Sequence, residues 1–119
     1  MNERSVLVLS TDPLAAALVG ALVETEGRTA VFARCGEAAR EALRRVRTRV
    51  VLADCGFPEA CGAALIGPAK MMGARVVLFG HPRIATLVND CAALYGVDVL
   101  PIPPGPGDMS RALSAVADA

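Results

Sequence analysis

Five short runs of mostly apolar residues recur along the chain. They lie at residues 5–10, 29–33, 49–54, 74–79 and 97–100. Runs of this length are typical of strands that are buried on both faces, as in a parallel sheet, and they are too short for most helices. We therefore predict five strands at these positions.

The stretches between the runs carry apolar residues at helical spacing. The first helix is predicted to begin at Pro13, with Asp12 as its N-cap, and to end before Gly27. Proline fits the first helical position, and an aspartate there accepts from free backbone N–H groups. Further helices are predicted over 36–47, 62–72 and 84–95, the third with a break or kink at Gly67-Pro68. A last helix is predicted to begin at a cap, Asp108.

The predicted inner positions of these helices repeat every three or four residues. They are Leu14, Ala17, Leu18, Ala21 and Leu22; Ala39, Leu43 and Val46; Ile84, Leu87, Val88, Cys91 and Leu94; and Met109, Leu113 and Val116.

Alternation of strand and helix predicts one α/β domain over residues 1–119, a doubly wound, five-stranded parallel sheet with helices on both faces. Hydrophobic residues make up 54% of the chain and aromatic residues 3%, so the core is built from Val, Leu and Ala. The strand residues predicted to be buried are Val6, Val8, Val51, Leu52, Val76, Val77, Leu78 and Val99.

Charge narrows the choice of partners. The formal net charge is +0, which gives no reason to expect nucleic acid or an anionic membrane as a partner. Arginines gather on the predicted second helix, where a solvated face or a docking patch for an acidic partner would explain them. They are Arg40, Arg44, Arg45 and Arg47. The first apolar run is too short for a signal peptide, and no stretch is long enough to span a membrane, so we expect a cytoplasmic protein.

Cysteine and histidine give no metal pattern. The four cysteines, Cys35, Cys55, Cys61 and Cys91, contain no C-x-x-C pair, and His81 is the single histidine. Reduced thiols are expected, with a redox pair of Cys55 and Cys61 as an alternative. A structural role is favoured over a catalytic one for His81. Neither a dinucleotide nor a P-loop motif is present.

One carboxylate lies where ligands commonly bind. Asp54 ends the third predicted strand and precedes a loop containing Gly56, Pro58 and Gly62. Ligands of open α/β sheets bind at the carboxyl ends of the strands. The strand and loop alone leave open whether Asp54 acts chemically or only shapes the turn.

With the five β/α units in register, the spacing Asp54-x-x-x-Pro58-x-x-x-Gly62 resembles the receiver domain of two-component response regulators over essentially all 119 residues. The resemblance implies a flavodoxin-like fold with strand order 2-1-3-4-5. It also implies that Asp54 corresponds to the phosphoacceptor, which a histidine kinase phosphorylates with magnesium bound.

Several positions depart from that family. Its acidic, magnesium-holding pair falls on Ser10 and Thr11, with Asp12 displaced by one residue, and its hydroxyl residue at the end of the fourth strand falls on Phe79. Hydroxyl groups are poor replacements for carboxylates around magnesium. These departures predict that magnesium binding is weak or absent and that no other cofactor is bound.

The end of the fifth strand departs as well. The family's lysine falls on Pro103, with Pro104 keeping the proline, and its partner-sensing aromatic residue falls on Leu100. A cis bond is expected between Pro103 and Pro104, since the matching bond in receivers is often cis.

The resemblance and its departures together predict a degenerate receiver, or pseudo-receiver, that is not an enzyme. Its function would be phosphorylation-independent signalling by protein–protein contact with a histidine kinase or an output protein. A homodimer through the fourth helix, fifth strand and fifth helix is a further expectation. Two alternatives remain: an active receiver phosphorylated on Asp54 with help from Asp12, and a small-molecule binder on the same fold.

Overall fold

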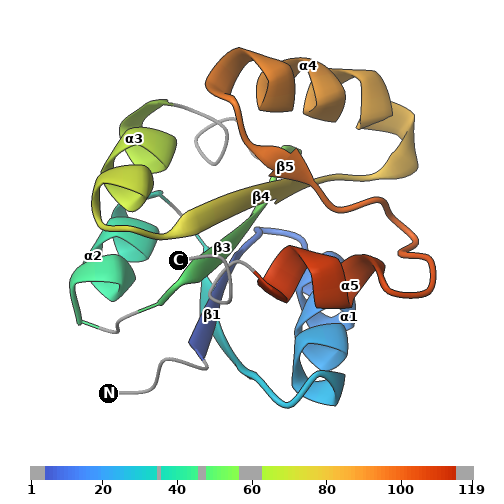
Figure 1. Ribbon diagram of the computed structural model, residues 1–119, viewed down its shortest axis with the longest axis horizontal. Helices are drawn as coiled ribbons and strands as arrows, with labels where there is room; N and C mark the ends of the chain where they lie inside the picture. Colours follow the sequence, from blue (N-terminus) through green and yellow to red (C-terminus); the bar gives the residue numbers. More distant parts are fainter. Residues whose placement is uncertain (1–4, 35, 46–47, 57–62, 115–119) are drawn as a thin grey trace.

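The computed structural model describes residues 5–34, 36–45, 48–56 and 63–114, in which strands and helices alternate (Figure 1). The strands are β1 (Ser5–Leu9), β2 (Thr29–Ala33), β3 (Val50–Asp54), β4 (Arg75–Phe79) and β5 (Asp98–Val99). The helices are α1 (Pro13–Thr25), α2 (Gly36–Arg45), α3 (Ala63–Met71), α4 (Ala85–Tyr95) and α5 (Asp108–Ala112), with a short 3₁₀ helix, η2 (Pro82–Ile84), before α4.

The five strands form one parallel sheet in the order β2-β1-β3-β4-β5. The predicted fold class and strand order are therefore confirmed. The edge strand β5 is shorter than predicted, because only Asp98 and Val99 pair with β4. The backbone N–H of Leu100 still donates to the carbonyl oxygen of Leu78 at 2.8 Å, which extends the contact by one bond.

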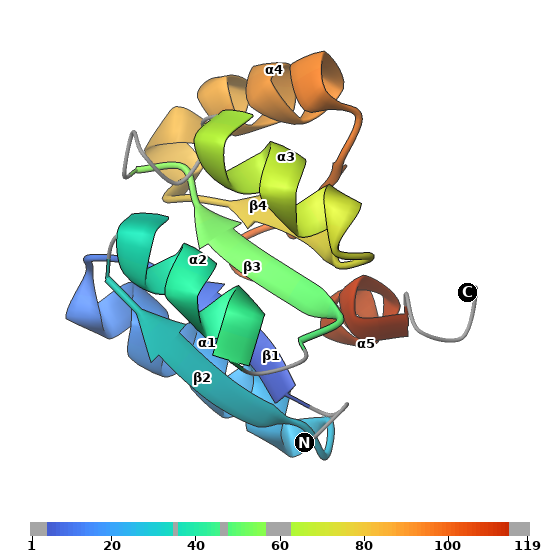
Figure 2. The ribbon, with the colours of Figure 1, turned by 90° about the vertical axis from the view of Figure 1, so that its left-hand side faces the viewer.

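Helices cover both faces of the sheet, with α1 and α5 on one face and α2, α3 and α4 on the other (Figures 1 and 2). The core between the sheet, α1 and α5 includes Val8, Val19, Leu52, Phe79 and Met109. The core on the other face includes Leu7, Leu43, Leu65, Leu78 and Val88. Neither face of the central strands meets water, as the apolar runs predicted.

Seven of the eight strand residues predicted to be buried are buried. The exception is Val99, which is half-buried. It belongs to the edge strand, which has a neighbour on one side only. That prediction is therefore wrong for Val99.

The inward face of α1 differs from the predicted one. Val19 and Val23 are buried, whereas Leu14 is 82% exposed and Leu18 is 45% exposed. The predicted inner residues Ala17 and Ala21 are exposed too, and only Leu22 is half-buried. Helix α1 carries apolar residues around most of its circumference, so periodicity could not select the face that packs.

Contact with β2 accounts for the orientation of α1. Gly20 lies against the ring of Phe32, and a Cβ atom added at Gly20 would stand 2.5 Å from its Cζ atom. The missing side chain lets the helix approach the strand closely, and this turns Val19 and Val23 towards the sheet.

Among the described residues, no helix is long and apolar enough to cross a membrane.

Helix α4 is also turned relative to its prediction. Val88 is buried and Cys91 half-buried, but Leu87 is 47% exposed and Leu94 is 76% exposed. Ala92, which was not predicted to face inward, is buried. Two leucines of α4 therefore lie on the surface instead of in the core.

The predicted start of α1 is correct in detail. Asp12 is the N-cap, and its side chain accepts from the backbone N–H of Leu14 at 3.0 Å. The last helix differs, because Gly107 is the N-cap of α5 and Asp108 is its first residue. The Asp108 carboxylate accepts from the backbone N–H of Gly105 at 2.6 Å.

The remaining helix predictions have mixed outcomes. Helix α3 runs through Pro68 without the predicted break. Helix α2 buries Ala39 and Leu43 as predicted. Within its basic face, Arg44 pairs with Glu41 at 2.5 Å and, by hydrogen bonding to that carboxylate, holds the pKa of Glu41 below its ordinary value. Val46, Arg47 and Val116 lie outside the described residues.

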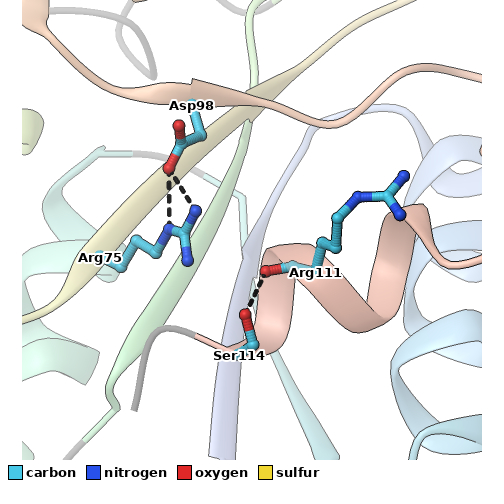
Figure 3. A network of polar contacts seen from close by, with 4 residues as sticks. All are labelled: Arg75, Asp98, Arg111 and Ser114. Atoms are coloured by element: carbon cyan, nitrogen blue, oxygen red, sulfur yellow. Dashed lines mark hydrogen bonds and ion pairs between the residues drawn. The ribbon is translucent and has the colours of Figure 1, made fainter. Parts of the chain in front are cut away.

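Polar contacts join β4 to the edge strand β5, and others lie at the end of α5 (Figure 3). Arg75 on β4 donates two hydrogen bonds to one carboxylate oxygen of Asp98 on β5, from Nε at 2.8 Å and from Nη2 at 2.5 Å. Ser114 donates to the carbonyl oxygen of Arg111 at 2.8 Å. Arg28, just before β2, donates to the carbonyl oxygen of Leu113 at 3.0 Å.

A matched pair of substitutions in α1 tests which face of the helix is buried. We expect Val23→Ala to lower the free energy of unfolding by about 2 kcal/mol, because it removes two buried carbon atoms and leaves a cavity. Leu14→Ala should change it by less than about 0.5 kcal/mol, because that side chain is exposed and alanine favours helices. Urea titration measures both values, and a larger loss for Leu14→Ala would contradict the observed orientation.

Candidate functional site

The alternation of side chains along parallel strands builds the site. Leu52 on β3 and Val77 on β4 both belong to the core under α1 and α5. Two residues further along, Asp54 and Phe79 are directly paired across the sheet and point to that same face. Ser10 follows the end of β1 beside them, so these three residues meet at the carboxyl edge of the sheet.

Asp54 is buried and engaged by two neutral donors. Its side chain is among the buried polar groups, with 8% of the residue exposed. The hydroxyl of Ser10 donates to Oδ2 at 2.8 Å, and the backbone N–H of Gly56 donates to Oδ1 at 2.8 Å. A Cβ atom at Gly56 would stand 3.2 Å from Oδ1, so glycine suits this close approach. Among the described residues, each carboxylate oxygen therefore has one hydrogen-bond donor, which leaves it a further lone pair.

Asp12 takes part in a separate arrangement at the start of α1. Its carboxylate caps the helix through Leu14, and its backbone N–H donates to the hydroxyl oxygen of Ser10 at 3.1 Å. Ser10 thus connects the Asp12 backbone to the Asp54 carboxylate. The side chain of Asp12 makes its own bond to the helix instead of joining Asp54.

A cavity of about 460 Å³ lies above Asp54. Its polar described walls are Thr11, Asp12, Asp54 and His81. Its larger apolar walls are Leu14, Leu18, Val19, Phe79, Pro82 and Ile102. The described lining residues include two carboxylates but no lysine or arginine.

The proline-rich loop after β5 contributes Ile102 to the cavity, next to Pro103, on which the resemblance placed the family's lysine. Ile102 lines the cavity, whereas Pro103 is exposed and does not. The cis bond also lies between Ile102 and Pro103, so the prediction of a cis Pro103-Pro104 bond is wrong. Sequence reasoning missed Ile102 because the proline-rich loop has no periodicity. Strand alternation offered a signal, since Ile102 lies two residues beyond Leu100, which is buried on the same face.

His81 caps a short helix, and the two described cysteines, Cys55 and Cys91, differ in their bonding. His81 is exposed, and its Nδ1 atom accepts from the backbone N–H of Arg83 at 3.0 Å, so it caps η2. Cys55 is disulfide-bonded, which makes the prediction of reduced thiols wrong at this position. Cys91 is free and half-buried. Cys35, Cys61, Pro58 and Gly62 lie outside the described residues.

The donor set around Asp54 does not fit magnesium. Within the described ranges, no group of three or more His, Cys, Asp or Glu residues could hold a metal ion. Magnesium prefers carboxylate and water oxygens in octahedral geometry. Here Asp54 already accepts from Ser10 and Gly56, and Asp12 caps α1.

Comparison with known proteins agrees with the fold. No family model and no curated protein matches the chain. Solved structures do match. NtrX from Brucella abortus, in complex with ADP, is 24% identical with a TM-score of 0.69, over 96% of this chain and 25% of that chain. The beryllofluoride-activated NtrC4 receiver domain dimer is 19% identical with a TM-score of 0.73, over 97% of this chain and 98% of that chain.

A CheY-like response regulator receiver domain protein from Methanospirillum hungatei is also similar. It is 16% identical with a TM-score of 0.74, and the match covers 98% of this chain and 95% of that chain. The chain therefore has the fold of receiver domains. It spans about a quarter of the NtrX chain but nearly all of the other two.

Replacing Ser10 tests how far Asp54 depends on its hydroxyl donor. We expect Ser10→Ala to lower the free energy of unfolding by about 1–3 kcal/mol, because a buried carboxylate oxygen loses a partner. Ser114→Ala is the matched control, since it removes an exposed hydroxyl bond and should cost less than about 0.5 kcal/mol. Equal losses of unfolding free energy in urea titrations of both variants would show that the hydrogen bond from Ser10 to Asp54 stabilises the fold no more than an exposed one does.

Proposed function

We propose that the chain is a receiver-like signalling module of the two-component type that acts by protein–protein contact without phosphorylation. The likeness to receiver structures supports the module, because it extends over nearly the whole chain. The observation that carries the second part is the state of Asp54. Its carboxylate is buried, held by Ser10 and Gly56, and surrounded by described walls without a cation.

An acyl phosphate on Asp54 would lack electrostatic support. It carries close to two negative charges. One unit countercharge at 4 Å contributes about 1 kcal/mol in water and about 4 kcal/mol at an effective dielectric constant of 20. Ile102 and Phe79 supply apolar surface where receivers place a lysine and a hydroxyl group. Both the product and the transition state leading to it are therefore disfavoured by several kcal/mol.

The same reasoning extends to the cofactor and to catalysis. Magnesium would have to share the Asp54 oxygens with their two described donors and recruit Asp12 from the cap of α1. We accordingly propose that magnesium binds weakly and that the module is not an enzyme. An active receiver using Asp12 as its second acid is the alternative, and it requires that helix cap to open.

Acetyl phosphate tests the proposal directly. Incubation with acetyl phosphate and magnesium should add no stoichiometric phosphoryl group, because the charge on Asp54 would be uncompensated. Intact mass measured at quenched time points checks this, with a phosphorylatable receiver domain as positive control. Addition of one phosphoryl group that Asp54→Asn abolishes would establish the active receiver instead.

The partner is proposed to be another signalling protein, either a histidine kinase or an output protein, or a second copy of the chain. The face formed by α4, β5 and α5 is the proposed contact. Leu87 and Leu94 support it, because these large apolar side chains of α4 lie on the surface. Neither nucleic acid nor a membrane is proposed as a partner, in line with the net charge of +0.

Sedimentation velocity tests the dimer face. We expect Leu87→Glu combined with Leu94→Glu to weaken self-association at least about tenfold, because burying an unpaired charge at an interface is costly. Leu14→Glu is the control, since it places a charge on an exposed leucine of α1, away from the proposed face. Dimers that persist in the α4 variant, or that dissociate only in the α1 variant, would exclude this face.

A further inference from the structure

We propose that the cavity above Asp54 binds a small organic cation, an amine with a compact apolar body. The ammonium group would meet the Asp54 carboxylate, and the apolar body would fill the space above it. The inference rests on the proposed function in one respect, since it requires Asp54 to remain without a phosphoryl group.

The charge of Asp54 is the first argument. Both of its described partners, the Ser10 hydroxyl and the Gly56 N–H, are neutral, and the described cavity walls contribute no lysine or arginine. A buried carboxylate without a countercharge is unfavourable. Its oxygens keep lone pairs beyond the two bonds they accept. An ammonium group can donate to these lone pairs and supply the missing positive charge.

The shape and lining of the cavity are the second argument. Its volume of about 460 Å³ lies in the range of ligand pockets, roughly 300–1,000 Å³. Leu18, Phe79 and Ile102 give it apolar walls, and Asp54 is the buried polar group among them. A few polar groups within a mostly apolar pocket are typical of small-molecule sites.

The second carboxylate fixes the sign of the ligand charge. Asp12 also lines the cavity, on its exposed side. Two carboxylates repel phosphates and carboxylic acids and attract cations. The site therefore takes a class of ligand opposite in charge to the phosphoryl group that receivers accept at this edge of the sheet.

Three probes with one shared body and different head groups test the inference on the full chain. They are 4-phenylbutylamine, 4-phenylbutan-1-ol and 4-phenylbutanoate, titrated while backbone amide shifts are followed by NMR. We expect the amine to bind with a dissociation constant on the order of 1 mM, as befits a fragment of this size. The alcohol should bind about tenfold more weakly, and the carboxylate should not bind. The shifts should concentrate at Ala15, Gly56, Gly80 and Ile102.

Two variants and one control test whether the ammonium group of the amine binds at Asp54. Asp54→Asn should weaken the amine about 10- to 100-fold, the usual range for losing a charged hydrogen-bond partner, and leave the alcohol nearly unchanged. Ile102→Lys should abolish amine binding, because the new ammonium group would itself reach Asp54. Met71→Lys adds the same charge at an exposed site on α3 and should leave binding unaltered. Amide spectra of the free variants confirm that each is folded.

Several results would overturn the inference. These are equal binding of amine and alcohol, amine binding that survives Asp54→Asn, and no binding by any probe at 10 mM, about tenfold above the expected constant. The acetyl phosphate experiment separates the two proposals. A chain that takes neither phosphoryl group nor amine refutes the cation site alone, whereas a chain phosphorylated on Asp54 refutes the proposed function as well.

Discussion

The central strands have no polar face, and the rest of the structure depends on this constraint. Every residue of β1 and β3 is buried, so helices must cover the sheet on both sides. Parallel strands joined by helices bring all their carboxyl ends to one edge. Residues that end or follow the strands therefore lie close together at that edge, whether they are polar or apolar. This is why Ser10, Asp54, Phe79 and Ile102 form one site despite their distance in sequence.

Asp54 places a buried carboxylate at that edge. Its carboxylate interrupts an apolar strand and must find donors in place of water. Ser10 and the N–H of Gly56 meet this need without adding charge. The receivers that the chain resembles surround the corresponding aspartate with acids, a metal ion and a lysine, which suits a group that gains and loses charge. The two described donors here, the Ser10 hydroxyl and the Gly56 N–H, are both neutral.

The strands could be predicted from sequence because each is a nearly continuous apolar run. Such a run indicates a buried strand even though apolar and polar residues do not alternate along it. Strand order came from the receiver resemblance. The buried face of α1 could not be predicted, since α1 is apolar around most of its circumference and its orientation depends on the contact between Gly20 and Phe32. Asp54 was found because a carboxylate at the end of a buried strand stands out. Ile102 was missed because a run of prolines between β5 and α5 sets no register, and the cavity arises from walls on four separate segments.

Under the proposed function Asp54 carries no phosphoryl group, so a change of state has to come from binding in the cavity. A ligand shifts a conformational equilibrium only by the difference between its affinities for the two conformations. Gly80 lines the cavity and also packs tightly under α4, where an added Cβ atom would stand 2.9 Å from Ile84 Cδ1 and from Val88 Cγ2. Close-packed groups at such a junction cannot move independently. An occupant that favours one position of Gly80 therefore biases the position of α4, and with it the surface that carries Leu87 and Leu94. The backbone segment around Gly80 supplies that connection, because it borders both the cavity and α4.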